Sequence, residues 1–206
     1  MNALIVVDVQ NDFCPDGKLA VPGGHEIVPL INSIMPLFDA IILTQDWHPK
    51  DHLSFASNHT DRHEYDTIDM DYGPQVLWPD HCVQSTPGAD FHPKLDTHFA
   101  HAIIRKGFRK HIDSYSGFTE NDQVTKTGLQ GLLTSLDIVN VFVCGLATDF
   151  CVKWTSIDSA SHGFNTFVIQ DASRGIDLND SMQKALFEMD NAGVHIINVD
   201  QIKENL

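Results

Sequence analysis

Six short apolar runs, separated by longer polar or amphipathic stretches, constrain the fold of this chain more than any other feature. Continuous apolar runs of this length are typical of strands that are buried on both faces of a parallel sheet. The runs are Ala3–Val7, Ala40–Thr44, Ala102–Arg105, Ile138–Cys144, Thr166–Gln170 and Val194–Val199. Because parallel strands need crossover connections, the pattern predicts an α/β fold, a three-layer doubly wound sandwich around a six-stranded parallel sheet.

The stretches between the runs contain the helical patterns that such crossovers need. Helices are predicted over His25–Leu37, Thr127–Ser135, Asp149–His162 and Asn179–Asn191. Thr148 is available as the N-cap of the third helix, and Gly163 as its C-terminal stop. In the fourth helix Met182, Leu186 and Met189 recur at helical spacing.

A long irregular segment interrupts this alternation. The chain has 206 residues, the size of one domain, and no Pro/Gly/Ser-rich linker divides it. We therefore expect a single domain over residues 1–206 with a long insertion at about 49–98. Eight of the twelve histidines lie between His48 and His101. A structureless insertion of this length is more often a functional loop than a connector.

The net charge and the composition argue against nucleic acid and membranes as partners of this chain. With 13 basic and 28 acidic side chains the net charge is −15, which repels a nucleic-acid backbone. No stretch approaches the roughly 18 apolar residues of a membrane helix, and the first residues lack the basic n-region of a signal peptide. Four cysteines without a Cys-x-x-Cys pair predict reduced thiols. We expect a cytoplasmic protein without nucleic-acid or membrane partners, and leave monomer or homo-oligomer open.

Chemically reactive side chains stand at the ends of four predicted strands. They are Asp8 after strand one, Asp46 and His48 after strand two, Lys106 after strand three, and Cys151, reached through Gly145, after strand four. Ligands of open α/β sheets bind at the carboxyl ends of the strands. Each residue alone has an ordinary structural explanation, but together they predict a carboxylate, an ammonium, a thiol and metal ligands at one rim.

Cys151 is the candidate nucleophile, because it falls in the first turn of the predicted helix Asp149–His162. The unpaired N–H groups and the partial positive charge at that end favour thiolate over thiol. The ammonium of Lys106 is expected to act in the same direction. The same N–H groups, with one from the preceding loop, are suited to hold the oxyanion of a tetrahedral intermediate.

Asp46 and His48 are candidate metal ligands. They lie two residues apart, so in an extended segment their side chains point to the same side. Oxygen and nitrogen ligands suit zinc, iron or manganese. His81 in the insertion is the third candidate ligand and His52 a fourth. Three protein ligands with open positions are typical of a working metal site, although on spacing alone an unrelated surface Asp-x-His is the alternative.

Six segments carry a resemblance to a known family. They are Val7–Phe13, Thr44–Pro49, Trp78–Val83, Ile104–Gly107, Asp113–Phe118 and Gly145–Cys151. In this order they resemble the isochorismatase-like cysteine hydrolases, and within that family the nicotinamidase (pyrazinamidase) type. The resemblance runs from residue 3 to about residue 200, and six motifs in family order are far more specific than any one of them.

The resemblance implies the isochorismatase-like hydrolase fold, with strand order 3-2-1-4-5-6, and a catalytic triad of Asp8, Lys106 and Cys151. That order leaves Lys106 on an outer strand, so its side chain must reach inward. A cis peptide is implied before Ala147, with the N–H groups of Ala147 and Cys151 as the oxyanion hole.

Further site residues follow from the same resemblance. It implies metal ligation by Asp46, His48 and His81, with one divalent ion, zinc in preference to iron or manganese. Phe13, Trp78 and Tyr115 match aromatic residues that hold a flat pyridine ring.

The implied activity is hydrolysis of nicotinamide to nicotinic acid and ammonia, through a thioester on Cys151, as a step of NAD salvage. Pyrazinamide is expected as a further substrate. One alternative is another hydrolase of the family, acting on isochorismate, a ureido acid or an N-carbamoyl compound; such relatives generally lack the metal ligands. A second alternative is a non-catalytic metal-binding or scaffold protein that kept the fold.

Overall fold

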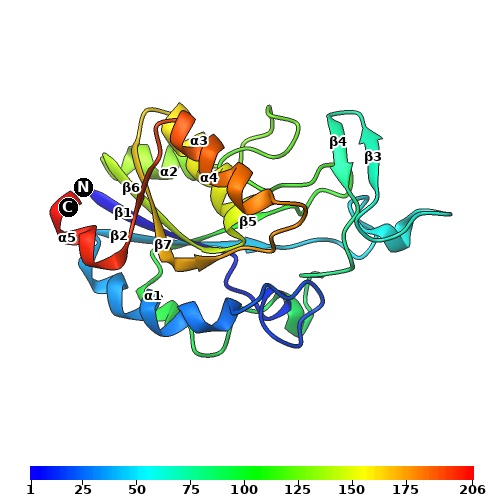
Figure 1. Ribbon diagram of the computed structural model, residues 1–206, viewed down its shortest axis with the longest axis horizontal. Coiled ribbons are helices and arrows are strands. Elements are labelled where there is room, and N and C mark those ends of the chain that lie inside the picture. The colour runs from blue at the N-terminus through cyan, green and yellow to red at the C-terminus, as the bar shows by residue number, and fades with distance from the viewer.

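A six-stranded parallel sheet runs through the centre of the computed structural model, which describes all residues from Met1 to Leu206 (Figure 1). Its strands lie in the order β5-β2-β1-β6-β7-β8, and every neighbouring pair is parallel. They are β1 (Asn2–Val7), β2 (Ala40–Asp46), β5 (Ala102–Lys106), β6 (Asn140–Leu146), β7 (Asn165–Arg174) and β8 (His195–Ile197). Counted along the chain, this is the order 3-2-1-4-5-6, so the predicted sheet is confirmed.

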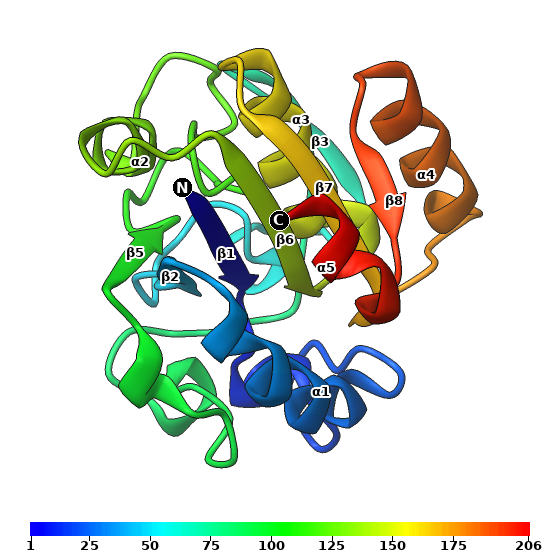
Figure 2. The ribbon, with the colours of Figure 1, turned by 90° about the vertical axis from the view of Figure 1, so that its left-hand side faces the viewer.

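Helices cover both faces of the sheet and complete the three layers (Figures 1 and 2). They are α1 (Val28–Ile34), α2 (Leu129–Ser135), α3 (Lys153–Ser161), α4 (Ser181–Asn191) and α5 (Ile202–Asn205). Leu4 and Val6 of β1 belong to the hydrophobic core that α1 and α5 cover. Ala3 and Ile5 belong to the core under α2, α3 and α4. Burial on both faces explains why the strand is apolar throughout.

The first predicted helix, His25–Leu37, is shorter than expected. A 3-10 turn at Gly24–Ile27 precedes α1, and another at Met35–Leu37 follows it. Pro36 lies in this second turn, and its missing N–H cannot continue the α-helical hydrogen bonding.

The third predicted helix, Asp149–His162, begins differently from the prediction. A π-helical turn at Thr148–Val152 leads into α3, and Ala147, with an extended backbone, takes the N-cap position without a side-chain cap. Thr148 is therefore inside the first turn, and its prediction as N-cap is wrong. Gly163 follows the helix with a φ of 87°, as expected for a C-terminal stop.

The insertion contains more regular structure than its composition indicated. An antiparallel hairpin of β3 (Thr67–Met70) and β4 (Gly73–Val76) stands apart from the main sheet, beyond the carboxyl ends of its strands (Figure 1). Short 3-10 turns lie at Ala56–Asn58, Pro87–Ala89 and Thr97–Phe99. None of the helices is both long and apolar enough to cross a membrane.

Candidate active site

A small, mostly apolar cavity lies at the carboxyl edge of the sheet, next to the ends of β2 and β6. It is lined by Phe13, Leu19, Asp46, Trp78, His81, Asp113, Tyr115, Ala147, Phe150, Cys151 and Ile176. All of these side chains except Tyr115, Phe150 and Ile176 are buried. The cavity therefore gathers residues from the first loop, the insertion and the start of the π-helical turn.

Lys106 lies next to this cavity and contacts three of the predicted site residues. Its ammonium nitrogen lies 2.8 Å from Asp8 Oδ2 and 2.5 Å from Asp46 Oδ1. It also donates to the carbonyl of Ser114, at 2.9 Å, and lies 3.4 Å from Cys151 Sγ. Burial alone would lower the pKa of Lys106, but Asp46 and Asp8 outweigh it and raise that pKa well above its usual range. The side chain thus stays a cation although it is fully buried.

The inward reach of Lys106 has a simple origin in the sheet. Lys106 and Asp46 are register partners in the β2–β5 pair, so they stand side by side at the last position of the ladder. From there the long side chain extends past β2 to Asp8 at the end of β1, the central strand. An outer strand can therefore supply this residue without any distortion of the sheet.

Asp8 ends β1 with a φ of 47°, and its side chain is fully buried. Its backbone N–H donates to Thr44 Oγ1 at 3.2 Å, and the same hydroxyl donates to Asp8 Oδ1 at 2.6 Å. Burial raises the pKa of Asp8, and the neighbouring Lys106 lowers it only in part. A carboxylate with a raised pKa beside a thiol is suited to accept a proton.

The Cys151 thiol lies close to the carboxylates of both Asp8 and Asp46. Ligand-type atoms of Asp8, Asp46 and Cys151 all lie within 4.8 Å of one another. Burial raises the pKa of the Cys151 thiol well above its usual value, and Lys106 opposes this only in part. The expected preference for thiolate is therefore wrong for the resting site: desolvation and two carboxylates outweigh the helix end and the ammonium. The thiol needs a base, and Asp8 is in place to be one.

The backbone before Cys151 has the form that the resemblance implied. The Leu146–Ala147 peptide bond is cis, and both Ala147 and Cys151 line the cavity. Gly145 precedes them with a φ of 120°, and a Cβ at this glycine would lie 2.2 Å from the carbonyl oxygen of Val7. Only glycine fits this contact between β6 and β1.

Asp46, His48 and His81 form a group with the geometry of a metal site. Asp46 Oδ2 lies 3.4 Å from His48 Nε2 and 3.7 Å from His81 Nε2. The opposite nitrogens, Nδ1 of His48 and of His81, are 2.8 Å from the carbonyls of Gly107 and Pro79. Carbonyls at Nδ1 leave both Nε2 atoms free to bind a cation, which is how metal-bound histidines are held. The three residues fit a divalent metal.

His52, the fourth candidate ligand, lies outside this group. Its ring is next to that of His48, with centroids 4.5 Å apart. However, its Nδ1 is 2.7 Å from Ser54 Oγ and its Nε2 is 3.2 Å from the carbonyl of Ile112. Burial lowers the pKa of His52 to about 4, so the ring is neutral near pH 7. His52 thus lies outside the Asp46–His48–His81 group, although its ligand atoms and those of His48 and Asp113 lie within 4.8 Å of one another.

Gly107 lies against the His48 ring, and its substitution tests whether His48 is a metal ligand. Its φ is 64°, and a Cβ at this position would lie 2.4 Å from His48 Cε1. We expect Gly107→Ala to displace the His48 ring and to weaken binding of a divalent metal about tenfold or more, the loss typical when the support of a ligand is removed. Zinc titration of the metal-free protein measures this.

Gly128→Ala is the matched control for that substitution. Gly128 also has a positive φ, 100°, but nothing lies within 4 Å of its added Cβ. Both variants carry a backbone cost, of about 1 kcal/mol or more, but only Gly107→Ala meets the His48 ring. Equal zinc affinity in the two variants would contradict the role given to His48.

Two residues that hold the metal group in place could not be predicted individually from the sequence. Gln10 accepts from the Asp46 N–H at 2.9 Å and donates to the Asp46 carbonyl at 2.8 Å, which holds the backbone of this residue. Asp12 accepts from the Cys82 N–H at 2.7 Å, next to His81. Both lie within the motif Val7–Phe13, so the motif marked the segment but not their roles.

The three aromatic residues expected around a flat ring all line the cavity. Trp78 meets Phe150 edge to face, with centroids 5.0 Å apart, and its indole N–H donates to the Tyr115 hydroxyl at 3.1 Å. Phe13 lies 5.5 Å from the His81 ring. Phe150 thus forms a further aromatic wall of the cavity, a role that the motifs in the sequence did not predict.

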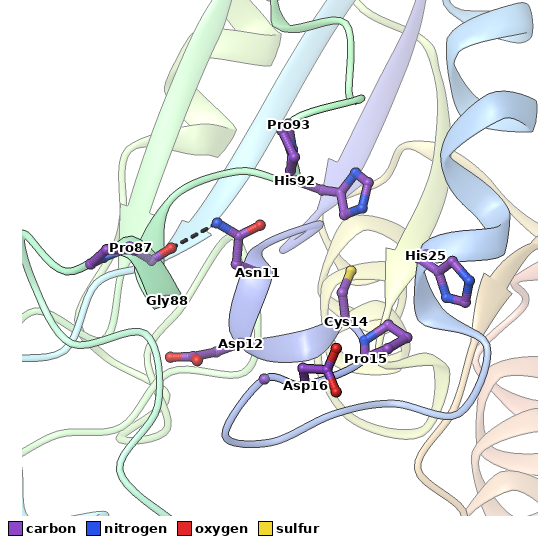
Figure 3. A pocket seen from close by; sticks show the side chains of 11 residues that line it. Asn11, Asp12, Cys14, Pro15, Asp16, His25, Pro87, Gly88, His92 and Pro93 are labelled. Carbon is purple, nitrogen blue, oxygen red and sulfur yellow. Dashed lines mark hydrogen bonds between the residues drawn. The ribbon is translucent and has the colours of Figure 1, made fainter.

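A second, more open cleft lies on the other side of the first loop (Figure 3). It shares no residue with the cavity that Cys151 lines. Asn11 donates to the Pro87 carbonyl at 2.7 Å across it, and Cys14 points between His25 and His92. Burial raises the pKa of the Cys14 thiol to about 11, so this cysteine is protonated near pH 7.

Comparison with known proteins places this fold and site in one family. The family model of the isochorismatase domain matches residues 2–201, and the chain belongs to the isochorismatase family. A nicotinamidase from Acinetobacter baylyi is 55% identical over 196 residues, which cover 95% of this chain and 92% of that protein. The resemblance inferred from the motifs is confirmed.

Solved structures agree with this assignment. A nicotinamidase/pyrazinamidase from Acinetobacter baumanii has a TM-score of 0.96 and 52% identity, covering 98% of this chain and 97% of that one. A pyrazinamidase from Pyrococcus horikoshii, determined in complex with zinc, has a TM-score of 0.77 and 38% identity, covering 96% and 98%.

Proposed function

We propose that this chain is a nicotinamidase, an amidase that hydrolyses nicotinamide to nicotinic acid and ammonia in NAD salvage, with pyrazinamide as a further substrate. The observation that carries the proposal is that Cys151 lines an aromatic cavity together with Asp46 and His81, with Asp8 and Lys106 next to its Sγ. We further propose that residues 1–206 act as one cytoplasmic catalytic domain.

In the first half of the reaction, Asp8 accepts the proton of the Cys151 thiol as Sγ attacks the amide carbon. Lys106, 3.4 Å from Sγ, stabilises the sulfur as its charge develops. The N–H groups of Ala147 and Cys151 receive the oxyanion. The carbon–nitrogen bond then breaks, and Asp8 returns the proton to the leaving group, which departs as ammonia and leaves a thioester.

In the second half, Asp8 takes a proton from water, and the oxygen of that water attacks the thioester carbon. Sγ leaves as a thiolate and recovers the proton from Asp8, which releases nicotinic acid. One residue therefore serves as base and acid in both halves. Lys106, held by two carboxylates and the Ser114 carbonyl, keeps this base in position.

Asp46, His48 and His81 would hold a divalent metal, and we propose zinc, because the pyrazinamidase from Pyrococcus horikoshii was determined with this metal. When bound, the metal supplies a Lewis acid that a pyridine nitrogen can bind. The aromatic walls at Phe13 and Trp78 then hold the ring flat between the metal ligands and Cys151.

The test of this function is ammonia release from nicotinamide and from a panel of other amides, with and without a chelator. We expect release from nicotinamide and pyrazinamide that a chelator suppresses and added zinc restores. Hydrolysis of ureido or N-carbamoyl compounds in their place, insensitive to the chelator, would favour the other hydrolases of the family and end the proposal.

The pH dependence of turnover provides a further prediction. Burial raises the pKa of Asp8 from its ordinary value of 3.8, and the base must be ionised to accept a proton. The value of kcat/KM should therefore fall as the pH drops through this raised pKa, at a pH above 3.8. The profile is measured at two zinc concentrations, both saturating near pH 7. If metal loss causes the fall in kcat/KM, more zinc shifts that fall to a lower pH; if protonation of Asp8 causes it, the pH of the fall stays the same. An acid limb at or below 3.8 contradicts the prediction.

A further inference from the structure

A buried carboxylate with no basic partner lies two residues before Cys151. The side chain of Asp149 is 1% exposed. Its Oδ1 accepts from the Ile176 N–H at 3.0 Å, and its Oδ2 accepts from the Asp177 N–H at 2.8 Å and from the hydroxyl of Ser181. The two N–H donors belong to the segment between β7 and α4, and Ser181 is the first residue of α4. No lysine, arginine or histidine pairs with Asp149.

This segment, residues 175–180, passes the carboxyl end of the sheet on its way from β7 to α4 (Figure 1). Asp177, Asn179 and Asp180 have positive φ angles of 59°, 54° and 62°. Aspartate and asparagine tolerate this region better than other non-glycine residues do. The segment bonds to the start of α4 through Asp177, Leu178 and Asn179. Asp149 accepts from two of its backbone N–H groups and so ties it to the helix of Cys151.

The same segment supplies one wall of the cavity that Cys151 lines. Only Tyr115, Phe150 and Ile176 among the lining residues are partly exposed, so a substrate enters past one of these. Tyr115 and Phe150 pack edge to face with Trp78. Ile176 has no such aromatic partner, and its backbone N–H bonds to Asp149. The wall at Ile176 is thus held by packing against the hydrophobic core and, through its backbone, by the Asp149 carboxylate.

We propose that Asp149 is a positioning residue for substrate binding, which fixes Ile176 as the closing wall of the cavity over a flat aromatic amide. This inference rests on the proposed function for the nature of the ligand. Asp149 does not touch the reacting atoms; it acts through the Ile176 and Asp177 N–H groups. Its removal should weaken binding much more than it slows the chemical step.

The hydrogen-bonding capacity of the Asp149 side chain explains why a carboxylate is needed to hold this segment. A carboxylate has acceptors only, and each of its two oxygens faces donors from the segment. An asparagine of the same shape would turn its NH2 group toward at least one of these N–H groups. Because the Ser181 hydroxyl can also accept, either orientation of the amide would lose one of the two N–H bonds, to Ile176 or to Asp177.

The test is Asp149→Asn, with steady-state kinetics on nicotinamide and calorimetric binding of nicotinamide in a Cys151→Ala background. We expect KM and the dissociation constant to rise about tenfold, which corresponds to about 1.4 kcal/mol, while kcat changes less than about threefold. Ser181→Ala removes the hydroxyl that donates to Asp149 Oδ2. It should raise KM and the dissociation constant by a smaller factor, which keeps the test valid if Asp149→Asn folds poorly.

Asp180→Asn is the matched control, since it makes the same change in the same segment at an exposed residue with a positive φ that asparagine tolerates. Trypsin cleavage after Arg174, at the start of the segment, reports its ordering directly. We expect faster cleavage in Asp149→Asn than in wild type or Asp180→Asn.

Three results would overturn the proposal: a fall in kcat at unchanged KM, unchanged binding in Asp149→Asn, or equal shifts in Asp180→Asn. The first would mean that Asp149 acts on Cys151 instead of on the wall. Failure of the proposed function is distinguishable, because the wild type would then release no ammonia from nicotinamide, whereas the cleavage rates after Arg174 would still show whether Asp149 anchors the segment.

Discussion

Replacing Cys151 with alanine is expected to reduce ammonia release from nicotinamide by at least about ten-thousand-fold, the scale seen when the nucleophile of a hydrolase is removed. No other sulfur lines the cavity, since Cys14, Cys82 and Cys144 are absent from its walls. The metal content should remain at the wild-type level, because Asp46, His48 and His81 do not involve the thiol. Single-turnover assays and metal analysis of the same preparation measure both results.

Cys14→Ala is the control for this variant. Cys14 is also buried, but it lines the other cleft and its pKa is raised to about 11. It should keep wild-type turnover. Substantial activity in Cys151→Ala would rule out the thioester mechanism, and loss of metal in that variant would show that the thiol belongs to the metal site.

The meeting of the strand-end residues could be predicted from the sequence because of a general property of parallel sheets. Carboxyl ends of adjacent parallel strands share one edge, so Asp8, Asp46 and Lys106 had to lie near one another once β1, β2 and β5 were identified. Pairing of Asp46 with Lys106 at the end of the ladder then places their side chains within 2.5 Å. Strand order needed the family resemblance, because apolar runs do not determine which strands are neighbours.

Contacts that depend on loop paths could not be predicted in this way. The carbonyl of Ser114 and the amide of Gln10 hold Lys106 and Asp46, but neither residue type has a characteristic spacing from its partner. The spacing of His52 from His48 did not show that Ser54 and Ile112 take its ring nitrogens. Such partners emerge only when the insertion is folded against the sheet.

The protonation state of Cys151 was the physical quantity most difficult to infer from sequence. A helix N-terminus and a nearby ammonium are visible as residues in order, and both favour thiolate. Burial is not visible, and neither is the closeness of two carboxylates, which come from β1 and β2. Desolvation reverses the expected direction, so the mechanism needs Asp8 as a base instead of a preformed thiolate.

Replacing His48 with alanine should remove bound metal and, with it, tight binding of nicotinamide. His48 supplies one of only three side chains in the metal group, so we expect zinc affinity to fall by more than about 100-fold, the upper end of the loss caused by removing an outer partner of a ligand. His63→Ala, an exposed histidine of the same insertion, is the control and should leave zinc affinity unchanged. Zinc titration and nicotinamide binding are measured on both variants.

The two readouts of His48→Ala separate two roles for the metal. If the metal orients the pyridine ring, the loss of zinc and the loss of nicotinamide binding should be proportional, and binding of benzamide, which has no ring nitrogen, should change little. If the metal only stabilises the fold around Asp46 and His81, both ligands should lose affinity equally and the melting temperature should fall with them. Unchanged nicotinamide binding in zinc-free His48→Ala would remove the metal from substrate recognition and leave the aromatic walls at Phe13 and Trp78 as the elements that hold the ring.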